Sequence, residues 1–219
     1  SLKPYYPYGC KRPTFHDEYL PTFNLQHVTL VDTAPLGVTK INKDGVVYND
    51  KEYPLDVLVY ATGFRWMEAA TFNMVIGKDG KSLKEKWALN GTKTFLGIHS
   101  NGFPNLFIVT GPQGGGGSFN FTDAIEAHGD YIIWMLETMK NQNTGVLDVK
   151  KKHEDEYSEH CRDVDTRTSA FRDCISYYND EGKAEPGSLA YYGGGQWHKR
   201  RIKAQKTLEP YLFNTAPRQ

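Results

Sequence analysis

Two adjacent cations, Lys11 and Arg12, are the residues whose type and position in this chain could carry chemistry. Gly9 and Pro13 flank them, and the proline ring fixes the backbone beside them. A guanidinium held in place can stabilise a developing oxyanion in a site without water, and a lysine is a good point-charge partner for phosphate. Taken alone, however, such a pair is more often a solvated pair of surface charges.

Two apolar runs, each expected to form a buried strand, end in small or glycine-rich segments. Leu55–Tyr60 leads into Ala61–Gly63, and Leu106–Thr110 leads into Gly111–Gly117. Small residues beyond a parallel strand let a cofactor approach the backbone, and N–H groups at the start of a helix attract anionic ligand edges. Alone, the first segment is more often an ordinary turn, and the second is as often a flexible surface loop. A GxxxxGK[ST] phosphate loop is excluded, because Gly117 stands where that motif needs a lysine.

The first half of the chain has the pattern of a small β-meander that leads into a central strand. Val28–Val31 is rich in β-branched residues and predicts a strand. Gly37–Ile41 and Val46–Tyr48 flank Asn42–Gly45, a hairpin signal in which glycine supplies a positive φ. Leu55–Tyr60 is almost continuously apolar, as in a strand that is buried on both faces of a parallel sheet.

Helical patterns follow the meander. The best short one is Leu83–Leu89, and a long helix is predicted from Phe121 to Met139 with Asn120 or Thr122 as its cap. Its apolar stripe consists of Ile125, Ile132, Met135, Leu136 and Met139. The other predicted helices are a charged one on the surface, Lys151–Ala170, and a short basic one, Trp197–Ala204.

Composition excludes several classes of protein. The 219 residues carry 26 basic and 26 acidic side chains, and the net charge of zero argues against nucleic acid as the main partner. The apolar runs are too short to cross a bilayer. Cys10, Cys161 and Cys174 lack metal-ligand spacing, which predicts free thiols in a reducing cytoplasm. His128 falls within the long helix, where a packed or surface histidine is commoner than a catalytic one.

Taken together, these segments resemble the C-terminal part of a type I Baeyer–Villiger monooxygenase. The similarity is collinear and covers almost the whole chain, and the order and spacing of the motifs make it specific. The expected fold is therefore α/β, the C-terminal part of a flavoprotein with two dinucleotide-binding domains. The matching segments are Tyr6–Pro13, Tyr19, Phe23-Asn24, Val28–Asp32, Asp56–Phe64, Leu83–Trp87, Gly102–Phe107, Gly111-Pro112, Asn120, Ile125-Glu126, Ser176–Tyr178 and Tyr192–Gly194.

The resemblance implies an enzyme that uses FAD, NADPH and O₂ to convert a ketone to an ester or lactone. In the family, NADPH reduces FAD, O₂ adds to give a C4a-peroxyflavin, and the tetrahedral adduct with the ketone rearranges. Arg12 matches the catalytic arginine that stabilises the peroxyanion and the adduct, and Lys11 matches the lysine that binds the 2′-phosphate of NADPH. The other matching cofactor-binding positions are Thr62, Gly63, Asn120, Phe121 and Tyr177.

The sequence departs from the family pattern in three ways. Tyr177 replaces a tryptophan that contacts the nicotinamide ribose, and a tyrosine has a shorter reach. Gly114–Gly117 is richer in glycine than the pattern, which predicts a looser substrate pocket. The two GxGxxG turns and the FxGxxxHxxxWP signature are missing, and the resemblance implies that they lie upstream of Ser1. Cofactor binding and activity are therefore expected to need an N-terminal part of the same protein.

The predicted domains are a connector at 1–24, the C-terminal part of the FAD-binding domain at 25–140, and a helical and loop segment at 141–219. The predicted partners are a ketone, O₂ and the N-terminal part, in the cytoplasm and without nucleic acid or membrane. Two alternatives remain open. One is a related flavin monooxygenase that oxidises nitrogen or sulfur, although such relatives generally lack the arginine found at Arg12. The other is a non-catalytic module that only packs against a partner.

Overall fold

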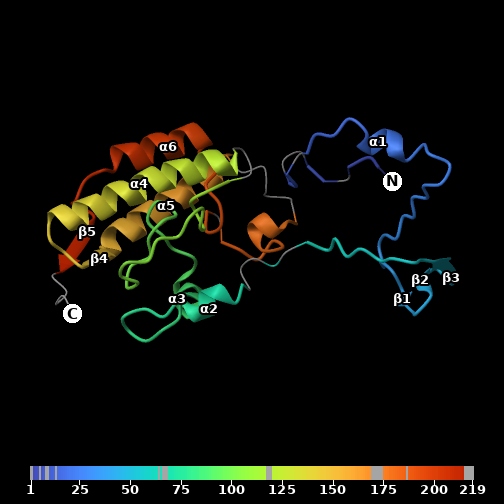
Figure 1. Ribbon diagram of the computed structural model, residues 1–219, viewed down its shortest axis with the longest axis horizontal. Helices are drawn as coiled ribbons and strands as arrows, with labels where there is room; N and C mark the ends of the chain where they lie inside the picture. Colours follow the sequence, from blue (N-terminus) through green and yellow to red (C-terminus); the bar gives the residue numbers. More distant parts are fainter. Residues whose placement is uncertain are drawn as a thin grey trace. The chain divides into compact units, whose positions relative to one another are not determined.

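The computed structural model describes residues 2–4, 6–7, 10–12, 14–63, 65, 69–116, 120–168, 175–185 and 187–214. The chain divides into two compact units (Figure 1). The first consists of Ser1–Tyr5 and Pro13–Phe64, and the second of Tyr6–Arg12 and Arg65–Gln219. Lys11 and Arg12 therefore belong to the second unit, together with the C-terminal residues.

The first unit contains the short helix α1 (Tyr19–Thr22) and an antiparallel sheet of three strands. The strands are β1 (Lys40–Ile41), β2 (Gly45–Tyr48) and β3 (Lys51–Pro54), in that order. The predicted hairpin is confirmed, because β1 and β2 pair with Ile41 opposite Val46. The sequence did not predict β3.

Gly45 is required in this sheet for a reason that the sequence did not suggest. A Cβ atom on Gly45 would lie 2.1 Å from the carbonyl oxygen of Tyr53 on β3, so any other residue would push the strands apart. The positive φ angles belong instead to Asn49 (50°) and Asp50 (59°), the two residues between β2 and β3. Two consecutive positive φ angles are typical of a type I′ hairpin turn.

Two predicted strands of the first unit are wrong in this structure. Val28–Val31 and Leu55–Tyr60 have no regular secondary structure. The second segment is also exposed, with 75% of Val57, 80% of Val59 and 68% of Tyr60 accessible to solvent. A central strand exists only when neighbouring strands satisfy its backbone N–H and C=O groups. The described part of the first unit supplies no such neighbours for Leu55–Tyr60.

The second unit combines helices with a small antiparallel sheet. Figure 1 shows α4, α5 and α6 running alongside one another, with β4 and β5 near the ends of the helices. The mixture of helices and strands agrees with the predicted α/β class, although both sheets of the described residues are antiparallel. The elements of this unit are α2 (Thr71–Met74), α3 (Leu83–Asn90), α4 (Phe121–Asn141), β4 (Val146–Val149), α5 (Lys151–Thr168), the 3-10 helix η2 (Tyr177–Asn179), α6 (Gly195–Ala204) and β5 (Tyr211–Asn214).

The four helices predicted in this unit all occur, but the predicted strand Leu106–Thr110 does not. That segment is irregular and partly buried. The N–H of Ile108 donates to the carbonyl of Ile98 over 2.8 Å, and no strand ladder extends from this bond. None of the described helices has both the length and the apolar character needed to cross a membrane.

The buried face of α4 differs from the predicted stripe. Met135 and Met139 are buried as predicted, but Ile125 is 45% exposed and Leu136 is 50% exposed. His128 and Tyr131 are fully buried in their place, together with Ala124. Polar side chains occupy this face because each finds a buried partner, and burial without one would cost several kcal/mol. A pattern of apolar residues alone cannot identify such positions.

Helix α5 was expected on the surface because it carries so many charges, and this expectation is wrong for one face. Tyr157 and Cys161 enter the core that also contains Tyr191 and Ile202, and Val164 is buried as well. The carboxyl of Glu154 is buried as well, with 2% of its side chain exposed. The charged residues therefore include structural ones that are paired inside the protein.

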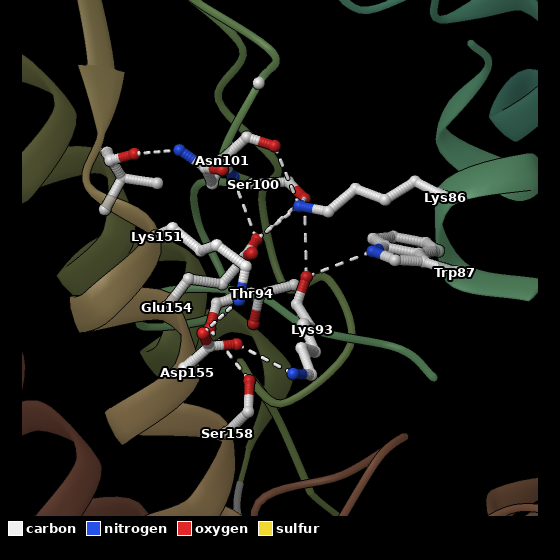
Figure 2. A network of polar contacts seen from close by, with 12 residues as sticks. Lys86, Trp87, Lys93, Thr94, Ser100, Asn101, Lys151, Glu154, Asp155 and Ser158 are labelled. Atoms are coloured by element: carbon white, nitrogen blue, oxygen red, sulfur yellow. Dashed lines mark hydrogen bonds and ion pairs between the residues drawn. The ribbon is translucent and has the colours of Figure 1, made fainter. Parts of the chain in front are cut away.

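Figure 2 shows the polar network that joins α3 to α5 around Glu154. The Lys86 ammonium lies 2.6 Å from Glu154 Oε1, with 16% of the Lys86 side chain exposed. Oε1 also accepts hydrogen bonds from Ser100 Oγ at 3.0 Å and from the Asn101 backbone at 2.8 Å. Burial lowers the pKa of Lys86, and the Glu154 charge opposes this shift. The network therefore connects Ser100 and Asn101 to both α3 and α5.

The prediction of three free thiols is wrong for Cys10, which is disulfide-bonded. Cys161 is a free and buried thiol, and burial raises its pKa to about 12. This thiol stays protonated and inert at neutral pH. Cys174 lies outside the described residues. Sequence spacing could not identify the pairing, because it depends on which segments meet in space.

Candidate active site

Arg12 is the centre of a polar and aromatic cluster in the second unit. Its Nε donates a hydrogen bond to the hydroxyl of Tyr178 over 2.9 Å, and its Nη2 approaches the carbonyl of Gly116 at 3.4 Å. The guanidinium carbon lies 5.2 Å from the centre of the Phe121 ring, a cation–π arrangement. The side chain is only partly buried. Arg12 is therefore held from three directions, and it is not one of two solvated charges.

The short helix η2 presents the tyrosines to Arg12. Ser176 is buried, and its Oγ accepts from the Tyr178 N–H while Asn179 Oδ1 accepts from the Ser176 N–H. This capping box fixes the start of the helix. The rings of Tyr177 and Tyr178 stack with their centres 4.2 Å apart.

The phenol of Tyr177 is protonated at neutral pH. Burial raises its pKa to about 12, its contact with Tyr178 adds to the shift, and Arg12 acts in the opposite direction. Tyr177 is nevertheless 39% exposed, so part of its ring can meet a ligand. The predicted Tyr177 thus does lie beside Arg12.

Asn120 and Phe121 begin α4 next to the same cluster. Asn120 Oδ1 accepts from the Thr122 N–H over 2.9 Å, which confirms Asn120 as the helix cap. The free N–H groups of the first turn carry the positive end of the helix dipole. Phe121 is 43% exposed and supports the Arg12 guanidinium from one side.

Lys11 adjoins the cluster without entering it. Its ammonium donates to the carbonyl of Ile175 over 2.9 Å at an exposed position. Thr62 and Gly63 belong to the first unit, and both are exposed. Gly63 has φ of 88°, and a Cβ atom there would meet nothing within 4 Å. Four predicted site residues besides Arg12 therefore lie in the second unit, and two lie in the first.

The first part of the glycine-rich loop is packed against neighbouring backbone. Gly114 is buried, and a Cβ atom on it would come within 2.9 Å of Gly97 Cα and of His128 Cε1. Gly97 itself has φ of 70° and packs against Gly114 from the other side. These glycines allow two backbones to touch. Gly117, the last glycine of the run, lies outside the described residues.

The sequence analysis missed three residues that build this site. Tyr178 holds Arg12, Gln113 anchors the loop through its buried amide, and His198 packs under the loop from α6. Tyr178 belongs to the same motif as Tyr177, so the sequence could have predicted it as a site residue too. Nothing in the spacing of Gln113 or His198 indicated that they would meet the loop.

Three buried histidines make the protein sensitive to acid. Burial lowers the pKa of His99 to about 3, of His128 to about 4 and of His198 to about 3. The unfolded chain takes up protons at these rings below its ordinary pKa of about 6.5, whereas the folded protein does not. Stability is therefore complete above pH 6.5 and falls as the pH drops, by roughly 2 kcal/mol per histidine between pH 6.5 and 5. Thermal unfolding midpoints measured from pH 7.5 to 5 test this, and a flat profile would contradict it.

The site offers hydrogen-bond donors and positive charge for an anionic or electron-rich ligand. Among the described residues, no cluster of three histidine, cysteine or carboxylate side chains could bind a metal ion. The exposed Lys11 ammonium, the partly exposed Arg12 guanidinium and the N-terminus of α4 fit the phosphate and ring edges of a dinucleotide or flavin. The chain thus has residues able to contact such cofactors.

Comparison with curated proteins shows which family has this combination of segments. A Baeyer-Villiger monooxygenase of Streptomyces coelicolor is 38% identical over 209 residues, which cover 90% of this chain and 34% of that protein. This chain is a relative of the Baeyer–Villiger monooxygenases. The family resemblance predicted from the sequence is confirmed. The chain spans about a third of the length of the curated relatives it matches, and no family model matches it.

Solved structures of Baeyer–Villiger monooxygenases share the fold. A polycyclic ketone monooxygenase from the thermophilic fungus Thermothelomyces thermophila matches 98% of this chain and 36% of its own length, with a TM-score of 0.84 and 31% identity. A complex of OTEMO with FAD and NADP matches 95% of this chain and 39% of its own length, with a TM-score of 0.76 and 25% identity. The expected α/β flavoprotein fold is confirmed, and the OTEMO structure contains FAD and NADP.

Proposed function

We propose that this chain is the part of an FAD- and NADPH-dependent Baeyer–Villiger monooxygenase that carries the catalytic arginine. The reaction consumes a ketone, O₂, NADPH and a proton, and it yields an ester or lactone, NADP⁺ and water. The observation that carries the proposal is Arg12, a partly exposed guanidinium held by Tyr178, Gly116 and Phe121. Its position in the motif matches the arginine that the family uses for this chemistry.

Arg12 acts by stabilising negative charge as it develops on the reacting oxygen atoms. When bound, the flavin takes a hydride from NADPH and activates O₂ for transfer of one oxygen atom to the ketone. A guanidinium has five N–H donors. Hydrogen bonds to the Tyr178 hydroxyl and the Gly116 carbonyl use some of them and fix the group, so the others can meet the substrate oxygen without further ordering.

The residues around Arg12 bind and orient the cofactors. Asn120 and Phe121 begin α4, whose positive end suits the flavin edge where negative charge collects on reduction. Tyr177 offers a partly exposed ring and a protonated hydroxyl to the nicotinamide ribose. Thr62 and Gly63 belong to the first unit and match family positions that contact FAD. These roles are carried over from the family motifs.

Lys11 selects NADPH over NADH through the 2′-phosphate. We expect Lys11→Ala to raise the KM for NADPH about tenfold and to leave the KM for NADH within twofold, because only NADPH loses a charge partner. The measurement is steady-state kinetics of the complete enzyme with each nucleotide. Equal changes in the two KM values would refute the role of Lys11.

The exposed apolar segment Leu55–Tyr60 supports the need for the N-terminal part of the same protein. Val57, Val59 and Tyr60 expose apolar surface that a folded enzyme normally covers. Strands from the N-terminal part would cover this apolar surface and would hydrogen-bond to the backbone groups of the segment. The chain therefore acts only together with that part, with 1–24 as the connector, 25–140 as the end of the FAD domain and 141–219 as the C-terminal segment. A cytoplasmic location completes the proposal, since that compartment supplies NADPH.

The proposal is tested with the complete enzyme and three substrates, a cyclic ketone, a thioether and a tertiary amine. Lactone formation that depends on NADPH and O₂ supports Baeyer–Villiger chemistry. Sulfoxide or N-oxide without lactone would instead identify a nitrogen- or sulfur-oxidising flavin enzyme. A colourless protein without a flavin absorption band, even after incubation with FAD, would identify a non-catalytic packing module.

A further inference from the structure

The loop that touches Arg12 is held in a conformation that its residues do not favour by themselves. Thr110 and Gln113 are not glycines, yet their φ angles are 51° and 63°. Left-handed backbone at residues with a Cβ atom costs free energy and persists only where the surroundings impose it. Something outside the loop must therefore fix both residues.

The side chain of Gln113 is the first anchor. It is 1% exposed. Its Oε1 accepts from the N–H and the hydroxyl of Thr94, both at 2.9 Å, and its Nε2 donates to the Gly187 carbonyl at 2.9 Å. The carbonyl of Gln113 accepts from the Tyr157 hydroxyl at 2.8 Å. A buried amide satisfied on both sides holds the loop at a defined place.

A pair of buried histidines is the second anchor. The Thr110 N–H donates to Nδ1 of His128 over 3.1 Å, and Nε2 of His128 lies 3.2 Å from Nε2 of His198. Both rings are 0% exposed. Nδ1 of His198 lies 3.4 Å from the Tyr157 hydroxyl, and the ring also bonds to the Gly114 backbone. The pair thus reaches the loop at its start, Thr110, and in its middle, at Gln113 through Tyr157 and at Gly114.

Only one arrangement of protons satisfies all of these contacts. A backbone N–H can only donate, so Nδ1 of His128 accepts and its proton sits on Nε2. That Nε2–H donates to Nε2 of His198, whose own proton then sits on Nδ1 and points toward the Tyr157 hydroxyl. The Tyr157 proton donates to the Gln113 carbonyl. Two neutral rings with opposite tautomers therefore complete the network.

The far end of the loop reaches Arg12. The Tyr191 N–H donates to the Gly115 carbonyl over 3.0 Å, and the next carbonyl, that of Gly116, faces Arg12 Nη2 at 3.4 Å. A shift of the loop would move this carbonyl. Because the Gly116 carbonyl is one of the contacts that hold Arg12, the orientation of the guanidinium would change as well.

We propose that His128 and His198 are positioning residues, whose hydrogen-bonded pair sets the loop at 110–116 and, through the Gly116 carbonyl, the catalytic orientation of Arg12. Only the part of this proposal that concerns the catalytic role of Arg12 rests on the proposed function. The anchoring of the loop by the histidine pair stands without it.

The test uses His198→Leu in the complete enzyme. Leucine fills much of the same space and removes both ring nitrogens, so His128 loses its partner. We expect backbone hydrogen exchange at 110–116, measured by mass spectrometry, to become at least tenfold faster than in wild type, while exchange in the middle of α4 stays within about twofold of wild type. We also expect the ester formed per NADPH consumed to fall at least fivefold, with NADPH oxidation per bound flavin within about twofold of wild type.

His99→Leu is the matched control. His99 is another buried histidine, 4% exposed, but its Nδ1 faces the Leu106 carbonyl and its Nε2 has no hydrogen-bond partner in the described structure. This variant should change thermal stability without changing exchange at 110–116 or the ester ratio. If His198 only stabilised the fold, His198→Leu and His99→Leu would both leave the ester formed per NADPH consumed unchanged. Loss of folded enzyme lowers both quantities together and does not alter their ratio.

Each outcome decides the proposal. Unchanged exchange at 110–116 in His198→Leu overturns the anchoring, and faster exchange with an unchanged ester ratio overturns the link to Arg12. If His198→Leu does not fold, His128→Asn keeps an acceptor for the Thr110 N–H and removes the nitrogen that faces His198, and faster exchange at 110–116 is again required. If the wild-type enzyme forms no ester, the proposed function fails, while hydrogen exchange still decides whether the histidine pair holds the loop.

Discussion

Replacing Arg12 by alanine is expected to lower ester formation in the complete enzyme by about 100-fold or more, the usual cost of removing a donor that stabilises a developing oxyanion. Reduction of the flavin by NADPH should change by less than about threefold, because hydride transfer needs no such donor. The variant should therefore consume NADPH and release hydrogen peroxide. Stopped-flow reduction and product analysis measure the two steps separately.

Two further variants sharpen this test. Arg12→Lys keeps the charge but loses the planar fork that bonds Tyr178 and Gly116, so it should recover only part of the activity. Arg162→Ala removes an exposed arginine that pairs with Glu159 on α5, and it should behave as wild type. Normal ester formation by Arg12→Ala would remove Arg12 from the mechanism.

Replacing Glu154 by alanine is expected to destabilise the protein by about 3–5 kcal/mol, because it leaves the Lys86 ammonium buried without its counter-charge. The Ser100 hydroxyl and the Asn101 backbone would lose their acceptor at the same time (Figure 2). Urea unfolding at pH 7.5 measures the loss. Activity per folded molecule should change little, since Glu154 does not contact the Arg12 cluster.

The neighbouring ion pair on α5 provides the control for this prediction. Lys151 pairs with Asp155 one turn away, but its side chain is 71% exposed. Lys151→Ala should therefore cost no more than about 0.5 kcal/mol. A cost for Glu154→Ala as small as that of Lys151→Ala would mean that the Lys86–Glu154 pair contributes nothing beyond a surface contact.

The surroundings of Arg12 and Glu154 explain why Arg12→Ala should affect activity and Glu154→Ala should affect stability. Arg12 is partly exposed, and its contacts orient a guanidinium that we propose stabilises negative charge on a bound ligand. Glu154 and Lys86 are largely enclosed, with 2% and 16% of their side chains exposed, and they pair with each other. The first residue is expected to affect chemistry with little effect on stability, and the second to do the opposite.

Elements with local sequence signals could be predicted before the fold was known. Asn120 caps α4 where it was predicted to, the hairpin around Asn42–Gly45 forms, and α3 and α6 begin within two residues of their predicted starts. Capping and turn formation depend on a few neighbouring residues, so they can be read without knowing the fold. The order of the motifs also sufficed to indicate the family.

Only the tertiary structure decided which residues meet across long stretches of chain. It brought Tyr178 and Gly116 to Arg12, and it buried His128 and His198 against each other where an apolar stripe was expected. It also left Leu55–Tyr60 exposed and irregular. The physical reason is the same in each case. Burial of a polar ring, and pairing of a strand, depend on partners distant in sequence that no local pattern records.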